Sequence, residues 1–148
     1  MIDWTCAPFA GLSGHDVHDL LALRCAVFVL EQDCAYLDID GQDPLPGTRH
    51  VLARDRGRLI ACARSLVPLG RGAEARIGRV VVAASHRRRG IARELLQRVV
   101  RDLESRLPGV AQRLDAQTVA VPLYESVGFA RAGEPFLEDG IAHVTMRR

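Results

Sequence analysis

The chain has 148 residues, of which 48% are hydrophobic and 26% are charged, and its formal net charge is +2. These are the values of an ordinary globular protein of single-domain length, and they argue against a disordered chain. We therefore expect a single domain over residues 1–148. No apolar run approaches the roughly 18 residues of a membrane span, and the first residues lack the pattern of a secretion signal. The expected location is the cytoplasm, without membrane contact.

The four cysteines show neither a C-x-x-C pair nor regular spacing, which predicts free thiols and argues against a structural zinc site. They are Cys6, Cys25, Cys34 and Cys62. His15 and His18 lie one helical turn apart, but no third metal ligand accompanies them. We therefore expect a protein without a metal.

The first part of the chain predicts a strand over residues 2–9 and an amphipathic helix over about 15–30, where apolar residues recur at helical spacing. Arg24 and Glu31 are seven residues apart and would share one face of that helix, so we expect them to pair. Anchoring the helix is a somewhat better explanation of Glu31 than a role in catalysis.

An acidic, turn-rich segment follows at residues 34–48. Asp38, Asp40 and Gly41 suggest a calcium loop, but the glycine comes too early and an arginine, Arg49, occupies the bidentate position. A loop over a cleft is the better interpretation, and the carboxylates of Asp38, Asp40 and Asp43 would attract a cationic amine. A merely solvated loop fits the composition equally well.

The rest of the chain alternates strands and helices. A hairpin over 50–54 and 58–67 leads to a long strand at 75–83, in which Gly78 indicates a bulge or a close backbone approach. A helix over 90–106, a strand over 113–117, a helix over 119–127 and closing strands at 129–132 and 141–147 complete the chain. This order predicts an α/β fold, with a mixed sheet of about seven strands and helices on both faces.

The junction after the long strand is the clearest candidate site. Val80, Val81 and Val82 suit a buried strand, and the chain then reads Arg87, Arg88, Arg89, Gly90, Ile91, Ala92 at the start of a helix. The free backbone N–H groups and the dipole of a helix start favour an anion such as a phosphate. Taken alone, the arginines would more often be a solvated cluster. The low net charge and their place at a helix start argue against a nucleic-acid site.

These residues resemble the acyl-CoA loop of the GNAT N-acetyltransferases, whose pattern is Arg or Gln, two residues, Gly, one residue, then Gly or Ala. A second stretch, Y-E-S-V-G-F from Tyr124 to Phe129, resembles the Y-x-x-x-G-F motif of the same family. Residues 23–32 and the tail E-D-G-I-A-H at 138–143 further resemble the ElaA-like subgroup. The resemblance covers nearly the whole chain.

The resemblance implies a mostly antiparallel sheet whose strands splay near Val82 and Gln117 to admit acetyl-CoA. The pantetheine arm would pair with the backbone at Val80 and Val82, and the pyrophosphate would rest on the loop. The expected residues for the co-substrate are Val80, Val81, Val82, Arg87, Arg88, Arg89, Gly90, Ile91, Ala92 and Arg93. Those expected for the acceptor are Arg24, Glu31 and Gln117.

Acyl transfer to an amine requires a neutral amine, a stabilised oxyanion and a proton for the departing thiolate. The resemblance makes Tyr124 the candidate general acid, and a tyrosine keeps its proton at neutral pH. Glu31 or His143 could act as the base through water, and this choice stays open. The expected acceptor is a small-molecule or peptide amine, and a homodimer is left open.

Two alternatives remain at this point. A GNAT fold could sense acyl-CoA or dock a partner without turnover, although the presence of Tyr124 favours an enzyme. An acyl-homoserine lactone synthase shares a similar segment near Glu31, but the larger acyl pocket and longer chain of that class are not apparent.

Overall fold

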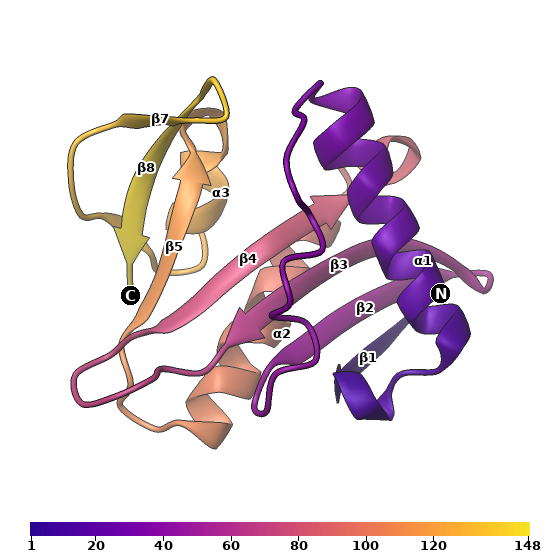
Figure 1. Cartoon of the computed structure of the whole chain (residues 1–148), viewed down its shortest axis with the longest axis horizontal. Coiled ribbons are helices and arrows are strands. Elements are labelled where there is room, and N and C mark those ends of the chain that lie inside the picture. The colour runs from indigo at the N-terminus through magenta and orange to yellow at the C-terminus, as the bar shows by residue number, and fades with distance from the viewer.

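The computed structural model describes all residues from Met1 to Arg148 as one mixed sheet with helices on both faces (Figure 1). The strands are β1 (Ile2–Pro8), β2 (Arg49–Asp55), β3 (Arg58–Leu66), β4 (Ala75–Val82), β5 (Gln112–Gln117), β6 (Ala130–Arg131), β7 (Phe136–Glu138) and β8 (Ile141–Arg147). The helices are α1 (Gly14–Arg24), which continues as a π-helix (Cys25–Glu31), α2 (Ile91–Arg106) and α3 (Val121–Glu125). No helix combines the length and the apolar character that crossing a membrane requires.

The strand order is β1-β2-β3-β4-β5-β8-β6, and β7 pairs with the other end of β8. Only the contact between β4 and β5 is parallel. The expected mixed, mostly antiparallel sheet is therefore confirmed. It has eight strands where about seven were expected, because Phe136–Glu138 forms a short strand within the predicted link between the closing strands.

The two faces of the sheet pack against different helices. Leu95, Leu96 and Val99 of α2 are fully buried in a large core with β2–β5, β8 and α3. A smaller core on the other face joins Leu20 of α1 to Leu52, Cys62 and Val81 of the sheet. Burial of this apolar surface is the main force that holds the layers together.

The start of α1 is fixed by a capping box, in which Ser13 accepts from the backbone of Asp16 and the Asp16 carboxylate accepts from the Ser13 backbone. Its far end is π-helical, and the N–H of Gln32 bonds to the carbonyl of Val27, five residues back. This wider turn changes the direction of the side chains after Arg24. The seven-residue spacing therefore no longer places Glu31 on the face that Arg24 occupies.

Candidate active site

Strands β4 and β5 run side by side for only two residues and then diverge (Figure 1). Their pairing joins Ala75 to Gln112 and Arg76 to Arg113, and no later residue of β4 pairs with β5. Beyond this point each strand has an unpaired backbone edge toward the gap, which is open to a further strand-like segment. The divergence expected from the sequence is thus present.

A bulge interrupts β4 at this gap. Gly78 pairs with Arg64 and Val81 with Cys62, so Arg79 and Val80 together oppose the single residue Ala63. Arg79 has φ +53°, a left-handed conformation that disfavours a residue with a Cβ by about 1–2 kcal/mol. The bulge thus lies directly after the glycine at which the sequence indicated it.

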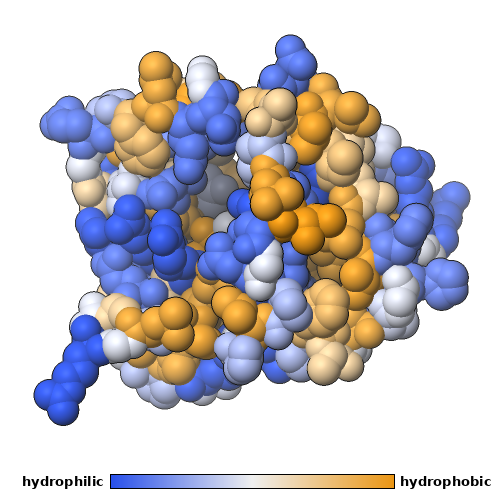
Figure 2. Space-filling model, in the orientation of Figure 1, coloured by the Kyte–Doolittle hydropathy of each residue, from blue (hydrophilic) through white to orange (hydrophobic).

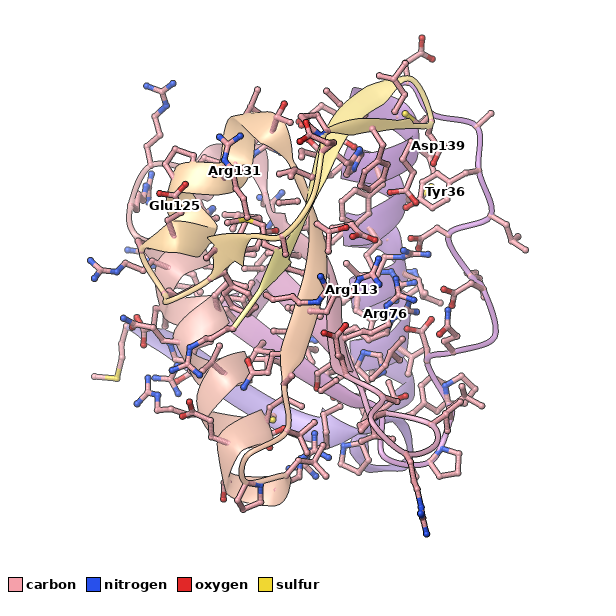
Figure 3. The ribbon with its side chains drawn as sticks, turned by 90° about the vertical axis from the view of Figure 1, so that its left-hand side faces the viewer. Tyr36, Arg76, Arg113, Glu125, Arg131 and Asp139 are labelled. Atoms are coloured by element: carbon pink, nitrogen blue, oxygen red, sulfur yellow. The ribbon has the colours of Figure 1, made fainter.

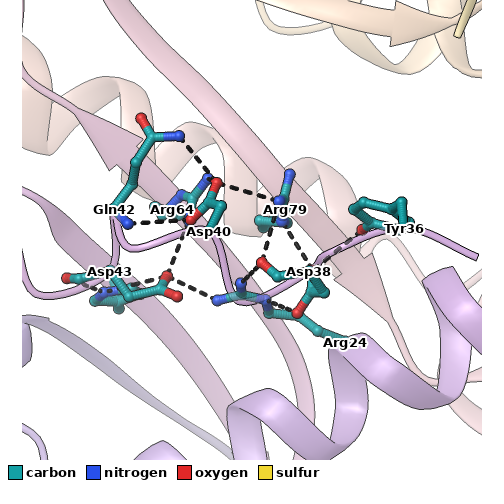
Figure 4. Close-up of polar contacts among 9 residues, drawn as sticks. Arg24, Tyr36, Asp38, Asp40, Gln42, Asp43, Arg64 and Arg79 are labelled. Atoms are coloured by element: carbon teal, nitrogen blue, oxygen red, sulfur yellow. Dashed lines mark hydrogen bonds and ion pairs between the residues drawn. The ribbon is translucent and has the colours of Figure 1, made fainter.

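The side chain of Arg79 is fastened to the acidic segment 34–48 (Figure 4). Its Nε lies 2.8 Å from Asp38 Oδ1, and its Nη2 donates to the Asp38 carbonyl and to the Asp40 carboxylate, each at 3.2 Å. The guanidinium also lies over the ring of Tyr36, 5.4 Å from its centroid. These contacts hold the left-handed residue in place.

Two further arginines complete this cluster. Arg24, of which 1% is exposed, donates to Asp38 and Asp43 at 2.9 and 2.8 Å. Arg64 donates to Asp40 and Asp43 at 2.9 and 3.1 Å. The arginine–aspartate network, as we call it, consists of Arg24, Arg64, Arg79, Asp38, Asp40 and Asp43.

The network overturns two expectations from the sequence. Its three carboxylates are paired with three arginines, and those of Asp38 and Asp43 are buried, so their charge is compensated within the protein and does not recruit a cationic amine. Burial opposes the charge of Asp43, but hydrogen bonds and attraction from Arg24 and Arg64 prevail and lower its pKa. Arg24 was expected to bind the acceptor, and this is wrong because its guanidinium is buried and bonded to Asp38 and Asp43.

A pocket of about 280 Å³ lies where β4 gives way to α2. It is lined by Val82, His86, Arg87, Arg88, Gly90, Ile91, Ala92, Arg93 and Leu123. Gly90 has φ +77°, which suits glycine, and no side chain caps the start of α2. The first N–H groups of the helix are therefore available to an anion.

The residues that the sequence analysis expected to bind the co-substrate thus line this pocket, with three exceptions. Arg89 is exposed outside the pocket lining, Val80 packs partly against the large core, and the side chain of Val81 is buried on the α1 face of the sheet.

Arg87 connects this pocket to the end of the π-helix. Its Nε donates to the carbonyl of Val82 at 3.0 Å, and its Nη2 lies 2.8 Å from the Glu31 carboxylate. Glu31 therefore pairs with Arg87, and the expected pair of Arg24 with Glu31 is wrong.

Tyr124 lies in α3 and belongs to the large core, with 9% of its surface exposed. Its ring meets Phe129 edge to face, with centroids 6.4 Å apart. Burial alone raises the pKa of Tyr124 to about 12, with no contribution from a hydrogen bond or a charge. The hydroxyl therefore keeps its proton throughout the neutral range.

The other end of the gap brings Gln117 and His143 together as cross-strand partners of β5 and β8. Gln117 donates to the side chain of Gln32 at 3.2 Å, which joins β5 to the end of the π-helix. His143 Nδ1 lies 2.7 Å from the carbonyl of Ile141. A carbonyl only accepts, so Nδ1 carries a proton and Nε2 holds the lone pair of the neutral ring.

The face of the sheet that carries Gln117 and His143 has further residues that the sequence analysis did not single out. They are Arg113 and Asp115, which share one side of β5 with Gln117 and alternate with the buried Leu114 and Ala116. The alternation in residues 113–117 is visible in the sequence and predicts one common face for its polar side chains. The partner of Arg113 across the gap, Arg76, becomes apparent only from the strand pairing.

Comparison with known proteins places the chain in a family. The model of the acetyltransferase (GNAT) domain matches residues 25–148. The chain belongs to the GNAT acetyltransferase family. It is 36% identical to the protein ElaA of Escherichia coli over 148 residues, which cover 100% of this chain and 97% of ElaA.

Solved structures agree with this assignment. The crystal structure of E. coli ElaA matches with a TM-score of 0.95 at 36% identity, covering 100% of this chain and 99% of ElaA. An acyl-CoA N-acyltransferase from Pseudomonas aeruginosa matches with a TM-score of 0.93, also at 36% identity and with the same coverage. The resemblance to the ElaA-like subgroup is therefore confirmed.

Proposed function

We propose that this GNAT protein transfers an acetyl group from acetyl-CoA to a primary amine. The observation that carries the proposal is the gap between β4 and β5 together with the pocket at residues 87–93, which includes Val82 at the end of β4. An extended pantetheine arm fits the first feature, and a pyrophosphate fits the second. The N-acyltransferase from P. aeruginosa, with the same fold at 36% identity, supports the choice of reaction.

The pyrophosphate would rest on the N–H groups from Arg87 to Ala92, where Gly90 leaves the backbone uncovered. Arg88, Arg89 and Arg93 would add positive charge around it. The backbone of β4 at Val80 and the N–H of Val82, whose carbonyl already accepts from Arg87, would hold the pantetheine arm. Val81 would take part through its backbone, because its side chain is buried on the opposite face.

Acetyl-CoA supplies an activated thioester, and the residues of the protein supply proton transfers and orientation. We assign the general acid to Tyr124, whose protonated hydroxyl can donate to the departing thiolate. The bulge of β4 places backbone N–H groups between Arg79 and Val82 beside the gap, where one can donate to the thioester oxygen.

For the base we favour His143 over Glu31. His143 Nδ1 is held by the Ile141 carbonyl, so Nε2, which lies 3.7 Å from the Glu138 carboxylate, is the ring atom left to take a proton, on the side of the sheet that carries Gln117. The Glu31 carboxylate is already engaged by Arg87, whose Nη2 lies 2.8 Å away.

The proposal is tested by thiol release from acetyl-CoA with a panel of primary amines, together with thermal melting in coenzyme A. Binding of coenzyme A should raise the melting temperature by mass action, and at least one amine should release thiol. Stabilisation without turnover of any amine would favour an acyl-CoA sensor. No stabilisation would contradict the proposed site as a whole.

A further inference from the structure

We infer that the acceptor is a primary amine that also carries a carboxylate, and that Arg76 and Arg113 hold this carboxylate. The inference rests on the proposed function and names the class of acceptor for that same site.

The first observation is the position of the two arginines. Arg76 and Arg113 are the last pair that joins β4 to β5, so they lie at the closed end of the gap. Figure 3 shows them next to each other, on the side of β5 that faces the segment of Tyr36. Alternation along β5 puts Asp115 and Gln117 on the same face.

The second observation is that this face is hollowed. In Figure 2 a depression lies between the β5–β8 side, where hydrophilic side chains gather, and the segment 34–48. Cys34, whose Sγ lies 3.6 Å from the Asp139 carbonyl, joins that segment to the turn between β7 and β8. The depression therefore has a wall on each side, and the two arginines lie at the closed end of the gap between β4 and β5.

The third observation is an excess of positive charge at the closed end. Arg76 and Arg113 share one carboxylate, that of Asp115, with a nitrogen of each 3.5 Å from it. Asp115 also accepts a hydrogen bond from Thr145 at 2.7 Å. The Arg113 Nε is buried without any partner, and 58% of the Arg76 side chain is exposed. The Arg113 side chain is 33% exposed, so the outer nitrogens of both guanidinium groups, which contact only Asp115 at 3.5 Å, can donate to a second anion.

Neighbouring charged groups do not supply that anion. Asp38 and Asp40 are paired with Arg79, and Glu74 is paired with Arg147 at 2.6 Å. A carboxylate of the acceptor would neutralise the remaining charge and accept from both guanidinium groups, whose planar donor sets suit a carboxylate. The amine of such an acceptor would then extend into the gap, where the thioester is expected.

The test compares the standard amino acids with their C-terminal amides as acceptors for acetyl-CoA. Each pair keeps the amine and the side chain and changes only the anion. We expect kcat/KM to be at least tenfold higher for the preferred amino acid than for its amide. Equal or better turnover of the amides, or no acetylation of any amino acid by protein that binds coenzyme A, would overturn the inference.

Variants connect this preference to the arginines. R76Q and R113Q should each raise KM for the amino acid about tenfold or more and leave turnover of the amide nearly unchanged, whereas R113K should restore part of the preference. R131Q is the matched control, because Figure 3 places the exposed Arg131 on the other side of the sheet. An equal loss of kcat/KM for the amino acid and its amide would mean that the arginine only supports the structure, and would contradict its role in binding the carboxylate.

The melting temperature measured with and without coenzyme A distinguishes failure of the inference from failure of the proposed function. If coenzyme A stabilises the protein but the acid–amide preference is absent, the inference alone fails. If coenzyme A does not stabilise the protein, the proposed function fails and the inference with it.

Discussion

The arginine–aspartate network should be a major source of stability, and Arg24→Met tests this most sharply. Arg24 is 1% exposed, and the side chains of its partners Asp38 and Asp43 are 9% and 6% exposed. Removing one member of a buried ion pair leaves the others without compensation, which typically costs about 3–5 kcal/mol. Arg79 and Arg64 still contact the two aspartates, so we expect a loss near 3 kcal/mol, or roughly 6–12 °C in Tm.

Urea unfolding at neutral pH, without coenzyme A, measures this loss. Arg54→Met is the matched control, because Arg54 also pairs with two aspartates, Asp16 and Asp19, at 2.7 and 2.8 Å. These side chains are 22–35% exposed, and such pairs contribute at most about 1 kcal/mol each. A loss below about 1 kcal/mol for Arg24→Met, or one equal to that of the control, would refute the reasoning.

The same variant should change the dependence of stability on pH. The pKa of Asp43 is lowered in the folded state, so its contribution is present above the unfolded pKa, near 3.9, and is lost as the pH falls through the folded value. Without Arg24, burial still opposes ionisation while part of the attraction is gone. The acid unfolding midpoint should therefore move to higher pH, and an unchanged midpoint would contradict the assigned cause.

Three further variants separate the proposed roles in catalysis. Tyr124→Phe keeps the ring, so Tm and acetyl-CoA affinity should hardly change, while the single-turnover rate should fall about 10²- to 10⁴-fold; an unchanged rate would remove Tyr124 from the mechanism. Glu31→Gln frees Arg87, so coenzyme A should bind up to about fivefold more tightly, as expected for an exposed ion pair of 0.2–1 kcal/mol. His143→Gln should lower the single-turnover rate about 10²-fold or more, and a comparable fall in Glu31→Gln instead would make Glu31 the base.

Much of the fold could be predicted from local patterns. The turn Asp55-Arg56-Gly57 located the β2–β3 hairpin, and the helical spacing from Ile91 to Leu103 located α2 with its buried face. These elements are specified by residues close together in the sequence. Local sequence also predicted the loop expected to bind a pyrophosphate, because the strand, Gly90 and the start of the helix follow one another directly in the chain.

The ion pairs could not be predicted in this way. Arg24 and Glu31 are both available on a regular helix, and only the π-helical turn and the tertiary packing direct Arg24 to Asp43 and Glu31 to Arg87. The sequence does not show that the carboxylates of the acidic segment are paired. The pairing arises only in the folded protein, where the arginines of β3 and β4 lie next to this segment. The same holds for Arg76, whose neighbour Arg113 lies on a strand 37 positions later in the chain.

Titration calorimetry with Gly90→Val tests whether coenzyme A binds at the loop before α2, on which the proposed function depends. Gly90 and Gly57 have φ +77° and +79°, and a Cβ at either would meet no atom within 4 Å. Gly57→Val therefore imposes the same backbone strain in the distant β2–β3 turn. Both variants should lose similar stability, and only Gly90→Val should lose coenzyme A affinity, by tenfold or more. Equal affinity of Gly90→Val and the parent protein would mean that coenzyme A does not bind at this loop.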